Sequence, residues 1–98
     1  MKRVNNERKL YARNGWLRMK KLVVFKAHWC APCKMLGKTL AETDLGVPVE
    51  TVDIDADPTS TVDFDIRGVP TVLLMDDNQV VKRRSGYMSA EQLKEFVG

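Results

Sequence analysis

Two short runs that carry no charged side chain limit the folds open to this chain. LVVF occupies residues 22–25, and TVLLM occupies residues 71–75. The first run is typical of a strand that is buried on both faces of a sheet, and the second predicts another strand. Because a sheet with two apolar faces must be covered on both sides, the runs indicate an α/β domain with helices over the sheet.

Further elements follow from the spacing of apolar residues. The sequence predicts strands at residues 49–54 and 80–84, and helices from the CAPC string to about Leu45, at 58–64 and at 90–97. Asp57-Pro58 and the pair Ser89 and Gln92 are helix-start signals, an N-cap followed by proline and a capping box. One crossover gives parallel strands and one tight turn gives an antiparallel pair, so we expect a mixed sheet.

The first 18 residues have a different character. Residues 1–21 carry eight basic side chains against one acidic side chain, whereas the rest of the chain carries eight against twelve. Residues 7–13 fit a short helix, although its apolar stripe is thin, and Asn14-Gly15 predicts a turn. We therefore predict a basic N-terminal arm at 1–18 and a single domain at 19–98. A solvated arm is expected, so nucleic acid is not an expected partner.

Neither export nor membrane insertion is expected. The first 15 residues are charged and polar where a signal peptide would have an apolar segment. No run approaches the roughly 20 apolar residues of a membrane-spanning helix. We therefore expect a cytoplasmic, monomeric protein with no membrane contact.

The only two cysteines of the chain are Cys30 and Cys33, in the string HWCAPC. A disulfide across so short a loop adds little stability, because loop-closure stabilisation grows with loop length. In a cytoplasmic domain such a pair is more often reactive than structural. A zinc site is the alternative. Since zinc takes four ligands, an Asp or a second subunit would have to complete a set of the two cysteines and His28.

The pair lies between a predicted strand and a predicted helix, which gives the two sulfurs different roles. Helix N-termini and CxxC motifs lower the pKa of a thiol from about 8.5 to about 3.5–7.5. Cys30, at the helix start, is therefore the expected attacking sulfur. Cys33, one turn further in and expected to be more buried, is the expected resolving sulfur. Pro32 fits the first helical turn without losing a hydrogen bond, and His28 is expected to be exposed.

The strings WCAPCK, DID and IRGVPT, with the closing SAEQLKEF segment, resemble the thioredoxin family over residues 22–98. The resemblance implies the thioredoxin fold, a central mixed β-sheet flanked by helices, here without the usual first strand and helix. It implies that Cys30 and Cys33 are a catalytic redox pair. The expected substrate-binding residues are Trp29, Ala31, Pro32, Gly68, Val69, Pro70 and Gly86. Pro70 matches the family's cis-proline, and the backbone of Val69 is expected to pair with the substrate.

The resemblance also implies a function. The expected activity is that of a protein dithiol–disulfide oxidoreductase without a bound cofactor or metal, which reduces protein disulfides and is recycled by an NADPH-dependent thioredoxin reductase. Two alternatives are a glutaredoxin-like, glutathione-dependent reductase and a non-catalytic accessory module whose basic arm contacts nucleic acid. Glutaredoxins have proline directly after the first cysteine, whereas Pro32 precedes the second one. We therefore favour the thioredoxin activity.

Four positions depart from the family pattern. Val24 stands where the family has a buried acid, and Thr51 stands where that acid has its lysine partner. Lys26 replaces a bulky aromatic residue, and Lys38 replaces a proline that kinks the helix. The resemblance assigns to the buried acid the deprotonation of the second cysteine. We therefore expect Cys33 to be activated less well in this chain.

Overall fold

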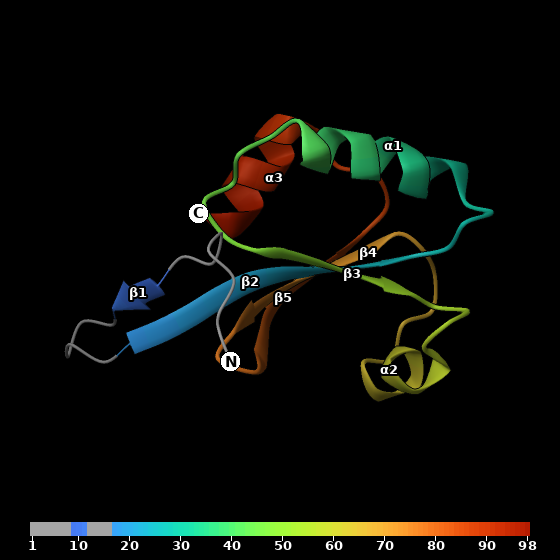
Figure 1. The fold of residues 1–98 in the computed structure, drawn as a ribbon, viewed down its shortest axis with the longest axis horizontal. Coiled ribbons are helices and arrows are strands. Elements are labelled where there is room, and N and C mark those ends of the chain that lie inside the picture. Colours follow the sequence, from blue (N-terminus) through green and yellow to red (C-terminus); the bar gives the residue numbers. More distant parts are fainter. Residues whose placement is uncertain (1–8, 12–16) are drawn as a thin grey trace.

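The computed structural model describes residues 9–11 and 17–98 (Figure 1). The strands are β1 (Lys9–Tyr11), β2 (Leu17–Lys26), β3 (Val49–Asp53), β4 (Thr71–Asp76) and β5 (Gln79–Ser85). The helices are α1 (Ala31–Ala41), α2 (Pro58–Asp63) and α3 (Ala90–Val97). From β2 onward, the order of strands and helices is the one that the sequence predicts.

Strand β2 is the centre of the sheet. It pairs in parallel with β3 and antiparallel with β4, and β4 pairs antiparallel with β5. The sheet is therefore mixed, as predicted. The parallel ladder places Leu22 opposite Val49 and Val24 opposite Thr51.

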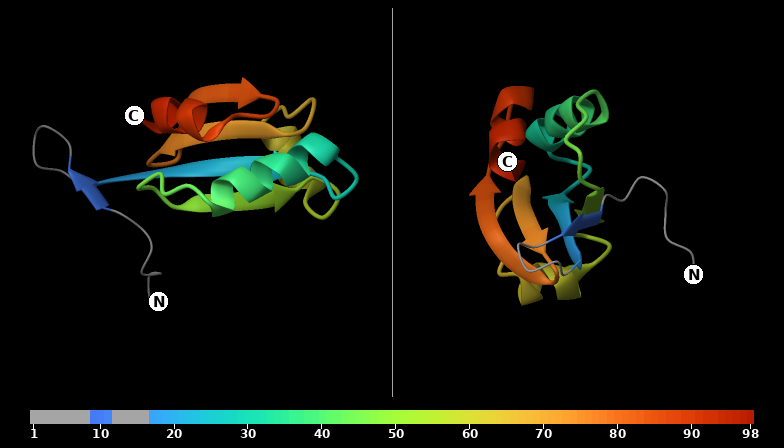
Figure 2. Two further views of the ribbon diagram at one scale, coloured as in Figure 1. Left: turned by 90° about the horizontal axis from the view of Figure 1, so that it is seen from above. Right: turned by 90° about the vertical axis from the view of Figure 1, so that its left-hand side faces the viewer.

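The two faces of the sheet are covered unequally. Helices α1 and α3 lie together on one face, whereas α2 lies on the other (Figures 1 and 2). The cluster under α1 and α3, called here the upper core, contains Leu22, Val24, Leu36, Val72, Leu74, Met88 and Leu93. The cluster on the α2 face contains Val23, Phe25, Leu73 and Met75. The residues of the two apolar runs thus alternate between the faces, which confirms that both runs are buried strands.

The prediction of a helix at residues 7–13 is wrong for residues 9–11, the part of that range that the structure describes. Lys9–Tyr11 form β1, which pairs antiparallel with the start of β2, with Lys9 opposite Met19. This pairing lies at the end of β2 that is remote from the CxxC (Figure 2). The backbone of β1 pairs with another strand, and such pairing cannot be predicted from the local helix propensity of residues 7–13. The rest of that expected helix and the Asn14-Gly15 turn lie outside the described residues.

Helix α1 is shorter than predicted, because it ends at Ala41 and not near Leu45. Beyond its end, the hydroxyl of Thr43 donates to the carbonyl of Thr39 over 2.7 Å, and the N–H of Gly46 donates to Asp44 Oδ1 over 3.0 Å. Side chains that bond the local backbone compete with helix formation. Leu45 nevertheless packs against the upper core, which accounts for its helix-like spacing.

The helix-start signals are confirmed. Asp57 caps α2 by accepting from the N–H of Ser60 over 3.0 Å, and Ser89 and Gln92 form both hydrogen bonds of the capping box. Each contact spans three residues, so sequence alone could specify it. None of the helices that the structure describes is long and apolar enough to cross a membrane.

Candidate active site

The two cysteines lie where β2 gives way to α1. A turn follows β2, in which the N–H of Cys30 donates to the carbonyl of Ala27 over 3.2 Å. Cys30 is the N-cap residue of α1. Ala31 and Pro32 then occupy the first helical positions, where the missing N–H of proline leaves no helical hydrogen bond unmade. The pair therefore has the predicted position at a strand end and a helix start.

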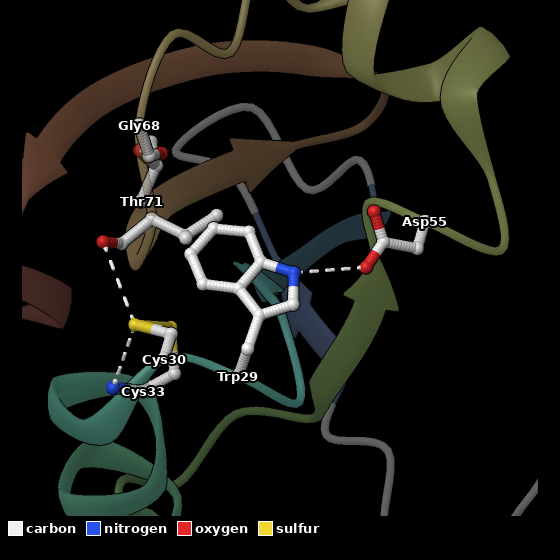
Figure 3. Close-up of a disulfide and its surroundings, with 7 residues drawn as sticks. Trp29, Cys30, Cys33, Asp55, Gly68 and Thr71 are labelled. Atoms are coloured by element: carbon white, nitrogen blue, oxygen red, sulfur yellow. Dashed lines mark hydrogen bonds between the residues drawn. A yellow bond between two sulfur atoms is a disulfide. The ribbon is translucent and has the colours of Figure 1, made fainter.

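Cys30 and Cys33 form a disulfide with their Cα atoms 5.2 Å apart (Figure 3). The backbone N–H of Cys33 donates to Cys30 Sγ over 3.2 Å. The sulfur thus takes the place that a serine or aspartate oxygen takes at the start of other helices. When the disulfide is opened, this N–H and the helix dipole both favour negative charge on the Cys30 sulfur.

Burial does not distinguish the two cysteines in this oxidised form. Cys30 is 6% exposed and Cys33 is 5% exposed, so the greater burial expected for Cys33 stays a prediction. Both belong to a small cluster with Ala27, against which Ile54 and Val69 pack. The difference between the sulfurs lies in the hydrogen bond and the helix end, which act on Cys30.

The segment before β4 lies against the disulfide. The peptide bond between Val69 and Pro70 is cis, and Pro70 is fully buried. The carbonyl oxygen of Val69 lies 3.7 Å from Cys30 Sγ. The structure thus brings together the cysteines and the proline that the resemblance paired with them.

Two glycines adjoin this segment. The carbonyl of Gly68 accepts from the hydroxyl of Thr71 over 2.7 Å, and the N–H of Gly86 donates to the carbonyl of Pro70 over 2.8 Å. Gly86 has φ +93°, a backbone conformation that side-chain-bearing residues rarely adopt. The hydrogen bond from Gly86 therefore links the end of β5 to the backbone of Pro70, beside the disulfide.

Trp29 stands on the rim of the site and is held by a residue that the sequence analysis did not single out. Its indole N–H donates to Asp55 Oδ2 over 3.0 Å, although its side chain remains 62% exposed (Figure 3). Asp55 is itself fixed, because its N–H donates to Asp53 Oδ1 over 2.9 Å. His28 is exposed as expected, with Nδ1 3.8 Å from Asp55 Oδ2. The only available signal for Asp55 was its place in the DID string.

The residues described by the structure offer no group of three or more His, Cys, Asp or Glu side chains arranged to hold a metal ion. Neither His28 nor Asp55 completes a set of four ligands around the cysteines.

Comparison with known proteins supports the same assignment. Residues 14–98 match the Thioredoxin family profile. The chain belongs to the thioredoxin family. The thioredoxin of Buchnera aphidicola subsp. Baizongia pistaciae is 36% identical over 80 residues, which cover 78% of this chain and 73% of the relative. The thioredoxin of Mycoplasmoides gallisepticum is 34% identical over 82 residues, covering 80% of this chain and 82% of the relative.

Solved structures agree with this membership. The crystal structure of chloroplastic thioredoxin z superposes with a TM-score of 0.69 at 30% identity, over 80% of this chain and 74% of that one. A thioredoxin-2, described as a component of malaria parasite protein secretion machinery, gives a TM-score of 0.75 over 97% of both chains. Its identity is 18%, so it supports the fold alone.

Family membership and the Cys30–Cys33 pair together confirm two predictions. The fold is the thioredoxin fold, and the protein is a dithiol–disulfide oxidoreductase. Membership implies protein disulfides as substrates and a reductase as electron donor in general terms.

Proposed function

We propose that this thioredoxin reduces disulfides of other proteins, with Cys30 as the attacking sulfur and Cys33 as the resolving sulfur. The observation that carries this order is the 3.2 Å hydrogen bond from the N–H of Cys33 to Cys30 Sγ at the start of α1. Both that N–H and the helix dipole stabilise a thiolate on Cys30. A thiolate is the form of cysteine that attacks disulfides.

The reaction has two exchange steps. The Cys30 thiolate attacks one sulfur of the substrate disulfide, and the other substrate sulfur leaves as a thiolate that takes up a proton. Cys33 then loses its proton and attacks the Cys30 sulfur of the mixed disulfide. The second substrate thiol is released, and the two electrons given to the substrate leave a Cys30–Cys33 disulfide behind.

The substrate chain is proposed to lie along Val69. The carbonyl of Val69 is 3.7 Å from Cys30 Sγ, so an extended chain that pairs with this backbone would bring its disulfide onto the attacking sulfur. Pro70, which follows Val69 through a cis peptide bond, is the second proposed contact residue of this segment. The remaining proposed contact residues are Trp29, Ala31, Pro32, Gly68 and Gly86.

An NADPH-dependent thioredoxin reductase is the proposed electron donor, and a monomer in the cytoplasm is the proposed working form. The support is family membership together with the chemistry of the cycle. Each turnover oxidises the cysteine pair, so activity requires a reducing compartment and a reductant that opens the disulfide again. The two cysteines carry the electrons themselves, and no bound cofactor is needed.

The assignment is tested by separate Cys30→Ser and Cys33→Ser variants. With insulin as substrate, Cys33→Ser should accumulate a mixed disulfide that gel electrophoresis without reductant detects, whereas Cys30→Ser should not. Accumulation in Cys30→Ser alone would reverse the two roles. Insulin reduction at the wild-type rate by both variants would overturn the proposed function.

A further inference from the structure

Strand β3 has one edge that no other strand covers within the part of the chain that the structure describes. It pairs with β2 alone, and it lies at the margin of the sheet opposite to β5 (Figure 2). The carbonyl of Pro48 accepts from the N–H of Leu22 over 2.9 Å, and the N–H of Ile54 donates to the carbonyl of Lys26 over 3.0 Å. Because backbone groups alternate along a parallel ladder, the even-numbered residues of β3 face β2, and the odd-numbered ones direct their N–H and carbonyl groups outward.

Two residues offer backbone groups on this edge. They are Val49 and Thr51, whose N–H and carbonyl groups make no hydrogen bond to any other described residue. The edge ends at Asp53, because its carbonyl accepts from the N–H groups of Ala56 and Asp57 in the turn that follows. Unpaired N–H and carbonyl groups in a row are a template for a further extended chain. The backbone of Val49 and Thr51, called here the free edge of β3, can therefore hold one more strand.

A cavity of about 350 Å³ lies beside the free edge, on the face of the sheet that α2 covers. Its floor is apolar and buried, since Val23, Phe25 and Met75 line it and are at most 6% exposed. Glu50 and Val52 of β3 also line the cavity, on either side of the free edge at residue 51. A strand added to this edge would lie about 4.8 Å from β3, so a long apolar side chain on it reaches the cavity.

The chain around this edge is acidic. Residues 39–66, which include β3 and α2, carry eight acidic side chains and no lysine, arginine or histidine. Lys21 of β2 offsets the charge of Glu50 through an ion pair of 2.9 Å. Charged side chains on an edge strand hinder association with other strands in general. Because these charges share one sign, they repel acidic chains and attract basic ones.

We propose that the free edge of β3 and the adjoining cavity, together called the β3 surface, bind an extended segment of a partner protein. This segment alternates lysine or arginine with a long apolar residue such as leucine. Backbone pairing with Val49 and Thr51 supplies affinity, and the cavity selects the apolar side chain. A second copy of this chain is a poorer occupant through its own β3, since two acidic edges would then meet.

The β3 surface is separate from the reactive pair. The residues that line the cavity come from β2, β3, β4, α2 and the loops beside them, and none of them belongs to the site around the disulfide. Binding at the β3 surface therefore requires neither cysteine. If the partner also carries a disulfide, anchoring it here raises the effective concentration of that disulfide near Cys30. The inference goes beyond the proposed function and can fail independently of it.

The test measures the binding of fluorescent peptides of about six residues, the length of a typical strand, by fluorescence anisotropy. One peptide alternates lysine with leucine, and the matched peptide alternates glutamate with leucine; neither contains cysteine. At low salt the lysine peptide should bind about tenfold more tightly or better, since only its charge complements the β3 surface. A third peptide groups the same leucines at one end. It should bind more weakly than the alternating lysine peptide, because its leucines then point to both faces of the sheet.

Variants test the backbone and the charge separately. Thr51→Pro removes the outward N–H but no hydrogen bond to β2, and edge strands accept proline at such a position. It should weaken binding of the lysine peptide about tenfold, because a peptide carbonyl loses its donor. Glu50→Lys reverses a charge whose side chain is 56% exposed, and it should weaken binding about fivefold. Glu95→Lys makes the same change on α3, outside the β3 surface, and should stay within about twofold of wild type.

Equal binding of the lysine and glutamate peptides would overturn the inference, and so would wild-type affinity in both Thr51→Pro and Glu50→Lys. Glu50→Lys supplies the answer if circular dichroism shows that Thr51→Pro fails to fold. Dimers in sedimentation that the lysine peptide dissociates would assign the β3 surface to a second copy and overturn the proposed partner. Tighter peptide binding by a chain that begins at Leu17 would overturn it in favour of the N-terminal residues of the same chain. Insulin reduction, measured alongside, tests the proposed function separately.

Discussion

Val24 of β2 and Thr51 of β3 are register partners in the parallel ladder, and Val24 is 3% exposed within the upper core. The resemblance places a buried acid and its lysine partner at these positions. Removing one partner of a buried ion pair costs about 3–5 kcal/mol, because the other charge is left unpaired. Here both members are replaced, so no unpaired charge is left in the core. The core is apolar at this point, without the carboxylate to which the family resemblance assigns deprotonation of the second cysteine.

Val24→Asp should destabilise the protein, and the loss should grow with pH. Burying a poorly satisfied carboxyl group costs about 1–3 kcal/mol. Burial raises the folded-state pKa of the new group above its unfolded value of about 3.9, so the penalty increases as pH climbs from the unfolded to the folded pKa. Urea denaturation of wild type and variant at pH 4 and pH 7.5 measures the difference in unfolding free energy.

Val24→Asn is the matched control for this prediction. Asparagine has nearly the same shape as aspartate but does not titrate. The loss of stability of Val24→Asn relative to wild type should therefore be similar at both pH values. If Val24→Asp loses no more stability at pH 7.5 than at pH 4, then the carboxyl group is not desolvated at this position.

Asp57 should contribute stability at neutral pH that disappears in acid. The N–H of Ser60 and, to a smaller extent, its hydroxyl donate to the Asp57 carboxylate, and they lower its pKa from the ordinary value of 3.8. A depressed folded-state pKa means that the contribution is complete above the unfolded pKa and is lost as pH falls through the folded one. Asp57→Ala should therefore lower the urea midpoint at pH 7 and lower it less near pH 2.5.

Asp57→Asn separates the charge from the helix cap. Its side-chain oxygen still accepts from the N–H of Ser60, so the loss should be smaller than in Asp57→Ala and nearly independent of pH. A loss in Asp57→Ala that is the same at pH 7 and pH 2.5 would contradict the assigned role of the carboxylate.

Asp55→Ala should weaken substrate binding through Trp29. The variant removes the acceptor of the 3.0 Å hydrogen bond that holds the exposed indole. Because Trp29 is a proposed contact residue and not a reacting group, KM for insulin should rise about two- to fivefold, with kcat less affected. Asp55→Asn keeps an acceptor oxygen and should remain close to wild type. Equal effects in the two variants would point to the charge of Asp55 instead of the hydrogen bond.

Removal of residues 1–16 should leave the oxidoreductase intact. Within the part of the chain that the structure describes, β1 pairs with Leu17–Met19, whereas β4 pairs with Lys20–Phe25 and β3 pairs with Leu22–Lys26. A chain that begins at Leu17 keeps the β2 ladders with β3 and β4, so it should retain the circular dichroism of the full chain and reduce insulin within about a factor of two of its rate. Failure of the shortened chain to fold would show that the N-terminal residues supply part of the core.

The same pair of chains tests the basic arm as a polyanion contact. Any heparin binding by the full chain should weaken steeply with salt and be absent from the shortened chain. Binding that survives the truncation would place the basic surface within the domain.

Much of the fold was predictable because its signals are local. The capping interactions of Asp57 with Ser60 and of Ser89 with Gln92 each span three residues. The two apolar runs identified the buried strands, and the CxxC could be placed at a helix start from the pattern around it. The resemblance then supplied the pairing of the cysteines with Pro70, which lies far along the chain.

Other features were decided only by the tertiary structure. Trp29 and Asp55 are 26 residues apart, and Thr39 and Tyr87 are 48 apart, and neither pair has a local pattern. Strand β1 and the end of α1 also differ from the prediction. Pairing with β2, the hydrogen bond that Thr43 donates and the one that Asp44 accepts outweighed helical spacing. Sequence by itself determined the elements from β2 onward, apart from the end of α1, and the reactive pair, since these depend on neighbours along the chain. Strand order and register determined which side chains surround that pair, since they bring distant residues within hydrogen-bond distance.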